Sequence, residues 1–93
     1  MYRIDARGFL VDPSEWDEEF AQRRADDLKM RGALSERHWE LIRYLRERHA
    51  ESGAVPTVFE TCEAHGIELD VLESLFPDGY HRGAVRLAGL RVR

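Results

Sequence analysis

The stretch from Ser35 to Gly53 constrains the fold most, because it combines a start signal, an apolar stripe and a stop signal for one helix. Ser35 can cap the first turn with its hydroxyl, and Gly53 can take the left-handed conformation that ends a helix. One helical face carries the stripe: His38, Leu41, Ile42, Leu45 and His49. We predict a central helix over residues 36–51. We also expect the histidines at positions 38 and 49 to hydrogen-bond to backbone.

Proline and glycine divide the rest of the chain into shorter helical segments. Pro13 predicts the start of a helix that Asp12 or Ser14 can cap. Trp16 and Phe20 lie on its apolar side. The later predicted helices are three: residues 56–66, residues 69–76 before Pro77, and a last helix after Gly79.

The N-terminal residues 1–12 have the pattern of a β-hairpin. Residues 2–4 and residues 9–11 are apolar or β-favouring runs, and Gly8 between them can take a positive φ in the turn. A lone hairpin is marginally stable, so it must pack on helices. We predict a mainly α fold in which this hairpin covers a helical bundle of residues 13–93.

Length and composition indicate one domain, residues 1–93, because 93 residues with 43% hydrophobic content can form one core and not two. No apolar run approaches the roughly 18 residues of a membrane span, and residues 1–5 lack the apolar stretch of a signal peptide. We therefore expect a cytoplasmic protein with no membrane contact. The single cysteine, Cys62, excludes an internal disulfide and a paired-cysteine zinc or redox centre, so we expect neither metal nor cofactor.

Charge is distributed unevenly along the chain. Residues 1–79 hold eighteen acidic side chains and ten Lys or Arg, whereas the remaining fourteen residues hold four arginines and no acid. These arginines are the candidate partner-binding residues: Arg82, Arg86, Arg91 and Arg93. If the last helix continues to the end of the chain, the first, second and fourth of them share a face that suits phosphates or an acidic protein surface. The alternative is a helix C-terminus that cations stabilise through its dipole.

The order of short motifs carries further information. The motifs are GFLV at 8–11, Trp16 followed by acids, LSERHWE at 34–40, LR at 45–46, VP at 55–56, LFPDG at 75–79 and RLAGL at 86–90. In this order and spacing, the chain resembles the DsrC/TusE family of sulfur-relay proteins from end to end. The resemblance implies a hairpin packed on an orthogonal bundle of about five short helices.

The resemblance also implies a mechanism that this sequence does not support. In that family, a flexible C-terminal arm carries sulfur on a penultimate cysteine, and some members have a second cysteine in the helix before the Arg-x-Ala-Gly-Leu segment. Here Val85 stands at the helix position, and the sequence ends Leu90-Arg91-Val92-Arg93 with no cysteine. A persulfide carrier needs an accessible thiolate. Both of the family's thiol positions are therefore empty in this sequence.

Cys62 is the remaining thiol, and two interpretations apply to it. His65, three residues later on the same predicted helix, could lower the pKa of Cys62 and activate it. The competing and favoured interpretation is a small buried hydrophobe, because a thiol in the middle of a helix lacks the reach of an arm. We likewise expect four aromatic side chains to form core and not a ligand groove: Trp16, Phe20, Trp39 and Phe59.

Three functions follow, in order of preference. The first is a non-enzymatic binding or regulatory protein of sulfur metabolism or tRNA thiolation, with the partners that the resemblance implies: dissimilatory sulfite reductase, sulfur-transfer complexes and the tRNA thiolation enzyme. The alternative is a nucleic-acid-binding regulator, a helix-turn-helix with the hairpin as a wing and a basic last helix on phosphates, although the net charge of −4 counts against it. The third is a sulfur carrier that uses Cys62.

Overall fold

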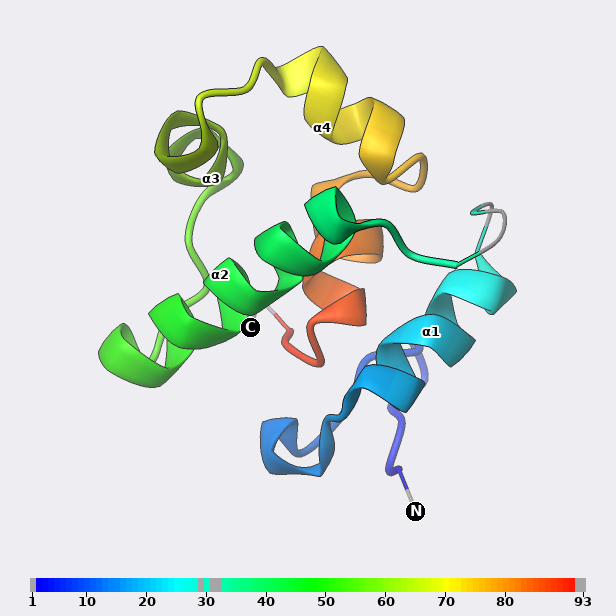
Figure 1. Cartoon of the computed structure of the whole chain (residues 1–93). Coiled ribbons are helices and arrows are strands. Elements are labelled where there is room, and N and C mark those ends of the chain that lie inside the picture. Colours follow the sequence, from blue (N-terminus) through cyan, green and yellow to red (C-terminus); the bar gives the residue numbers. More distant parts are fainter. Residues whose placement is uncertain (1, 29, 31–32, 92–93) are drawn as a thin grey trace.

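The central helix begins and ends at its predicted signals in the computed structural model, which describes residues 2–28, 30 and 33–91. Helix α2 spans Glu36–Ser52 and crosses the middle of the molecule (Figure 1). The Ser35 hydroxyl accepts a hydrogen bond from the His38 N–H, and the His38 ring accepts one from the Ser35 N–H in return. This capping box satisfies two helix-terminal groups at once. Gly53 ends the helix with a φ of 76°.

The His38 ring also joins the start of α2 to the end of a later helix. Its Nε2 lies 2.8 Å from the Leu75 carbonyl oxygen, and the ring packs edge-on against Phe76. Because Nδ1 accepts from the Ser35 N–H, the ring proton resides on Nε2, which donates to that carbonyl. The predicted backbone hydrogen bond of His38 is confirmed.

The other helical elements are shorter, and the last of them lies inside the others. They are η1, a 3-10 turn over Pro13–Glu15; α1, Glu18–Asp27; α3, Val58–His65; α4, Leu69–Leu75; and η2, a π-helix over Tyr80–Val85. Helix α2 contacts both α3 and η2, and α3 contacts α4. In Figure 1 the η2 segment lies behind α2, with α3 and α4 on one side and α1 on the other. The mainly α fold is confirmed.

The core forms where α2 meets the C-terminal segment. Its fully buried side chains include three from the predicted stripe of α2, namely Leu41, Ile42 and Leu45. Five small or apolar residues of the C-terminal part also belong to it: Ala84, Val85, Leu87, Ala88 and Leu90. The last helical segment is therefore an internal element that the other helices enclose.

The predicted N-terminal hairpin is wrong as a pair of strands. Within residues 2–12, the described part of this segment, only Ile4 and Leu10 form an antiparallel bridge, although hydrogen bonds from Asp5 N–H to Phe9 O and from Val11 N–H to Arg3 O flank it. The Asp5 carboxylate holds the turn by accepting from the Arg7 and Phe9 N–H groups at 2.9 Å each. Further pairing is lost because the neighbouring backbone has other partners.

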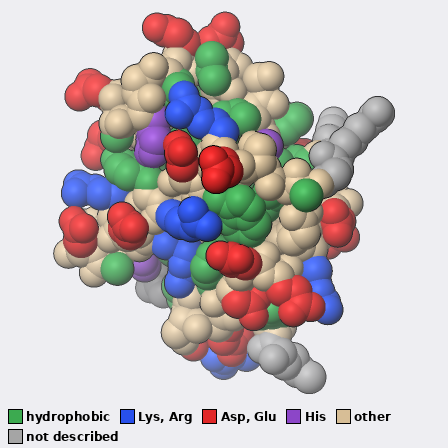
Figure 2. All heavy atoms as spheres, viewed as in Figure 1, with side chains coloured by type: hydrophobic (Ala, Val, Ile, Leu, Met, Phe, Trp, Pro, Cys, Tyr) green, Lys and Arg blue, Asp and Glu red, His purple; other side chains and the backbone are tan. Residues whose placement is uncertain are grey.

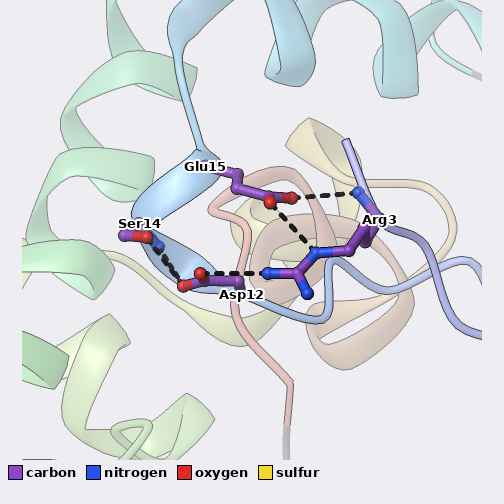
Figure 3. A network of polar contacts seen from close by, with 4 residues as sticks. All are labelled: Arg3, Asp12, Ser14 and Glu15. Atoms are coloured by element: carbon purple, nitrogen blue, oxygen red, sulfur yellow. Dashed lines mark hydrogen bonds and ion pairs between the residues drawn. The ribbon is translucent and has the colours of Figure 1, made fainter. Parts of the chain in front are cut away.

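Arg3 shows where those backbone groups go. Its N–H and its Nε donate to Glu15 at 3.0 and 3.1 Å, and its Nη2 pairs with Asp12 at 3.3 Å (Figure 3). Asp12 also accepts from the Ser14 N–H and caps η1. The Arg3 N–H is thus bonded to η1. It is not available to extend the strand pairing beyond the Ile4–Leu10 bridge.

The first helix begins later than predicted. Trp16 has extended backbone with a ψ of 141°, so the chain breaks between η1 and α1. Asp17 then caps α1 by accepting from the Phe20 N–H. Of the predicted caps, Asp12 caps the 3-10 turn instead, and Ser14 lies inside that turn and donates to Asp12.

The aromatic residues divide between core and surface. Phe20 is 1% exposed, as predicted, and Trp16 and Trp39 are half-buried against the core. Phe59 is 73% exposed, so its predicted core position is wrong. The buried side of α3 is the face of Thr61 and Cys62, and Phe59 points elsewhere on this two-turn helix.

Candidate functional site

The C-terminal helical segment, residues 80–87, begins with a π-helix that follows the turn at Pro77-Asp78-Gly79. Gly83 packs directly on Phe76, because a Cβ at this glycine would lie 3.0 Å from the Phe76 Cβ. The π-helix is a rare element in proteins, and those that occur are often found at functional sites. This segment carries two of the four candidate arginines.

The helical segment ends at Leu87 and a turn follows at Ala88 and Gly89, so the condition for a shared arginine face, a helix that continues through residue 91, is not met. Gly89 has a φ of 72°, and a Cβ there would lie 2.6 Å from the Trp16 ring. The Trp16 Nε1 donates to the Leu87 carbonyl at 2.7 Å, and Arg46 donates to the Ala88 carbonyl at 2.8 Å. These side chains satisfy the carbonyls that a longer helix would have used.

Arg46 is a structural residue that sequence analysis missed. Its guanidinium lies 4.3 Å from the Trp16 ring centroid and also donates to the Pro13 carbonyl at 3.2 Å. It therefore joins α2 to η1 and to the end of the chain. No local pattern identifies this role, because all of its partners are distant in sequence.

The candidate arginines do not share one helical face. Arg86 turns toward the N-terminal loop, where its Nη2 donates to the Arg7 carbonyl at 2.7 Å and its guanidinium stacks 4.8 Å from the Phe9 ring centroid. Its Nε is buried and has no hydrogen-bond partner in the described part of the chain. Arg91 pairs with Asp5 at 3.2 Å. Arg82 is exposed, and Arg93 lies outside the described residues.

Three of the candidates, Arg82, Arg86 and Arg91, line an open groove of about 1340 Å³ between the C-terminal helical segment and the N-terminal turn, which we call the arginine groove. Its charged lining consists of Asp5, Arg7, Asp78, Arg82, Arg86 and Arg91, and Phe9 and His81 also contribute. Arg7 is a residue that the sequence did not single out. It lies in the N-terminal turn, and only the tertiary fold brings that turn beside residues 82–91.

The only thiol of the chain lies outside the arginine groove. Cys62 is 8% exposed on α3, and burial together with the nearby Glu68 carboxylate raises the pKa of its thiol. The His65 Nδ1 lies 2.9 Å from the Thr61 carbonyl, and its ring packs against Tyr44. The raised pKa is opposite in sign to the shift that activation of Cys62 by His65 would produce. Cys62 thus has the environment of a buried hydrophobe.

Val85, at the helix position of the family's second cysteine, is fully buried in the core. Within residues 2–28, 30 and 33–91, no three His, Cys, Asp or Glu side chains gather in a way that could hold a metal ion. None of the helices in that same part of the chain is long and apolar enough to cross a membrane. The site is therefore defined by guanidinium groups in an open groove.

The fold and the motif order define a class of small helical sulfur-relay proteins, and sequence comparison identifies the family. The family model described as "DsrC like protein" matches residues 1–92. The chain is 34% identical to sulfurtransferase TusE of Photorhabdus laumondii, a match that covers 92% of this chain and 82% of that protein. It is 33% identical to sulfurtransferase TusE of Pectobacterium atrosepticum, covering 92% and 84%. The chain belongs to the DsrC/TusE family.

Solved structures agree with this assignment. Dissimilatory sulfite reductase I (DsrI) superposes with a TM-score of 0.93 at 28% identity, covering 99% of this chain and 88% of that one. The oxidized gamma-subunit of the dissimilatory sulfite reductase (DsrC) from Archaeoglobus fulgidus gives 0.85 at 35% identity, covering 99% and 89%. The family resemblance read from the motifs is confirmed.

Proposed function

We propose that this chain acts in sulfur metabolism or tRNA thiolation by binding a partner protein, without carrying sulfur on residues 1–93 and without catalysing a reaction. The observation that carries the proposal is the separation of the two features a sulfur carrier must combine. The thiol is buried on α3, and the accessible charged groove lies at the C-terminal segment. Contact and thiol chemistry are thus in different places.

The chemistry of a persulfide carrier explains why this separation matters. Such a carrier attacks or receives sulfur through a thiolate that a partner's active site can reach. Cys62 is shielded by the core, and its raised pKa keeps it protonated near neutral pH. Val85 supplies no sulfur at the second position. Under this proposal, the protein binds a relay partner as a scaffold or regulator.

The relatives suggest which partners to test. The curated proteins it resembles are named sulfurtransferases, and one superposed structure is named as a subunit of dissimilatory sulfite reductase. We therefore propose cytoplasmic sulfur-transfer complexes, the tRNA thiolation enzyme and dissimilatory sulfite reductase as candidate partners. These would meet a surface that contains the arginine groove.

Incubation with a polysulfide donor, followed by alkylation and intact mass spectrometry, tests the proposal directly. We expect no added sulfur, and we expect slow reaction of Cys62 with a thiol reagent until the fold is unfolded by urea. The control is Cys62→Ser treated in parallel. A stoichiometric mass increase that this substitution abolishes would show a sulfur carrier and reject the proposal.

The structure removes two supports of the nucleic-acid-binding alternative. The N-terminal hairpin that would act as a wing does not form a strand pair. The α3–α4 pair would have to serve as the helix-turn-helix. It lies within residues 49–81, which hold seven acids and no Lys or Arg. Acidic side chains gather at the upper edge of the face in Figure 2, over α3 and α4. Such a surface repels a phosphate backbone.

A further inference from the structure

The four guanidinium groups of the arginine groove form a fixed pair and a free pair. Arg86 is fixed by the Arg7 carbonyl and the Phe9 ring, and Arg91 is fixed by its ion pair with Asp5. The side chains of Arg7 and Arg82 are exposed, and neither guanidinium makes a hydrogen bond or ion pair with a described residue. The free pair can therefore bind a ligand without breaking a contact to residues 2–28, 30 or 33–91.

The fixed pair makes a preformed floor for this groove. Gly8 lies directly beside the Arg86 guanidinium, because a Cβ at Gly8 would be in ordinary van der Waals contact with the Arg86 Cζ at 3.5 Å, and its φ of 88° favours glycine. The stacked Phe9 and Arg86 side chains present a flat surface that combines an aromatic ring with a cation. A ligand that contacts this floor meets groups already held in place, which lowers the entropic cost of binding.

Size and charge indicate the class of ligand. The groove volume of about 1340 Å³ exceeds the roughly 300–1,000 Å³ of small-molecule sites, so one oxoanion would leave most of it empty. Asp5 and Asp78 lie among the arginines, and the neighbouring residues 49–81 hold no Lys or Arg. A polyphosphate chain would place charge beside these carboxylates as well as beside the arginines, whereas a peptide can place single carboxylates only where the cations are.

We infer that the arginine groove binds a short acidic segment of a partner protein, two of whose carboxylates pair with Arg7 and Arg82. This inference rests on the proposed function and gives its partner a chemistry. Guanidinium groups bind carboxylates through two parallel hydrogen bonds, a geometry that lysine cannot reproduce. The peptide lies along the Phe9 and Arg86 floor between the two free arginines.

Fluorescence anisotropy with a short labelled peptide of alternating Glu and Ser tests the inference, with the matched Gln and Ser peptide as a negative probe. We expect the acidic peptide to bind, to weaken as salt rises and to lose about tenfold or more in affinity in Arg7→Glu/Arg82→Glu, because two attractions become repulsions. The control is Arg37→Glu/Arg48→Glu on α2, which has the same net charge. It should bind as the wild type does.

Several results would overturn the inference. These are no binding of the acidic peptide, equal loss in both double variants, or tighter binding of inorganic sulfate or duplex DNA through the same two arginines. Circular dichroism checks the fold of each variant, and Arg7→Gln/Arg82→Gln replaces the charge reversal if that protein is unfolded. Polysulfide loading of the same samples keeps the two proposals apart. Sulfur uptake would reject the proposed function, whereas the peptide assay tests only whether the groove binds an acidic segment.

Discussion

The arginine groove and the α3–α4 pair are two surfaces of one small protein with opposite character. The groove is assembled from the two ends of the chain and lined by four arginines, whereas α3–α4 is one continuous stretch with acidic side chains and no Lys or Arg. The thiol lies in the acidic unit, and the exposed Arg7 and Arg82 side chains lie in the groove. Under the proposed function, the groove serves recognition, and it lies apart from the thiol of Cys62.

The two surfaces also differ in how they are held. Side chains from distant elements fix the groove, through Arg86 to the N-terminal turn and Arg46 to the end of the chain. Helix α3 has local caps at both ends: Thr57 and Glu60 form a capping box, and Gly66 ends the helix. Substitutions at the groove side should therefore have larger effects on stability than matched ones in α3–α4.

The largest effect should come from Gly89→Ala. A side chain at this position would combine a positive φ with a clash against the Trp16 ring, so we expect a loss of about 3 kcal/mol or more in the free energy of unfolding. The matched control is Gly66→Ala, which has a positive φ and open space and should cost about 1–2 kcal/mol. Urea titration measures both. Equal costs would mean that the Trp16 contact does not fix the C-terminal segment.

Tyr80→Phe should have a smaller effect. The Tyr80 hydroxyl donates to the Pro56 carbonyl and lies 3.0 Å from the Thr61 Oγ1, both buried, so its removal should cost about 1–2 kcal/mol. The control is Tyr44→Phe, whose hydroxyl has no hydrogen bond to the described residues, and we expect a change within about 0.5 kcal/mol. If Tyr44→Phe lowers the free energy of unfolding by as much, the hydroxyl contact between η2 and α3 does not stabilise the fold.

The same residue should make the protein sensitive to alkali. Burial raises the pKa of Tyr80 from 10.0 to about 12. Because the fold disfavours the phenolate, the contribution of Tyr80 is fully present below pH 10 and is lost as the pH rises through about 12. When the melting temperature is measured from pH 9 upward, it should fall less steeply with pH in Tyr80→Phe than in Tyr44→Phe. Identical slopes would contradict the assignment.

Asp5→Asn should remove part of the acid sensitivity of the groove side. Hydrogen bonds from the Phe9 N–H and the Arg7 N–H, with the Arg91 pair, lower the pKa of Asp5 below 3.8. Stability from this carboxylate is therefore present above pH 3.8 and is lost as the pH falls through the lower value in the fold. We expect the variant to be less stable at neutral pH and to decline less on acidification. An unchanged acid profile would show that Asp5 does not hold the turn.

The smallest effect is expected for Phe59→Ala in the α3–α4 pair. Because the Phe59 side chain is 73% exposed, its removal should change the free energy of unfolding by no more than about 0.5 kcal/mol. Denaturant melts measure this directly. A loss above about 2 kcal/mol would place Phe59 in a core and reverse the assignment of this face to the surface.

Sequence analysis succeeded for α2, α3 and α4, whose end signals lie within their own stretches, but it placed the start of α1 too early. The capping serine and the terminal glycine of α2 lie within its own stretch, and the apolar stripe between them lies on the buried face. The predicted ends of α3 near Gly66 and of α4 before Pro77 agree with the structure for the same reason. Caps and helix breakers act over a few residues, so they can be identified from the sequence without knowledge of the fold.

The N-terminal segment and the aromatic residues needed tertiary information. Alternation around Gly8 was compatible with strands, but Arg3 pairs with η1 and leaves one bridge. Phe59 has the residue type of a core position, but which face of a two-turn helix is buried depends on its neighbours. Residue type and alternation therefore predicted the pairing and burial of these residues less accurately than the capping signals predicted the helices.

By itself, the sequence determined the helical class, the central helix, the family and the basic character of the chain's end. Only the tertiary structure decided that Arg86 faces the N-terminal turn, that Arg91 pairs with Asp5 and that Arg7 joins Arg82 in one groove. The physical reason is the range of the interactions. Caps and helical periodicity act between near neighbours, whereas the groove requires residues about 75 to 85 positions apart to meet, and their contacts exist only after the core has formed.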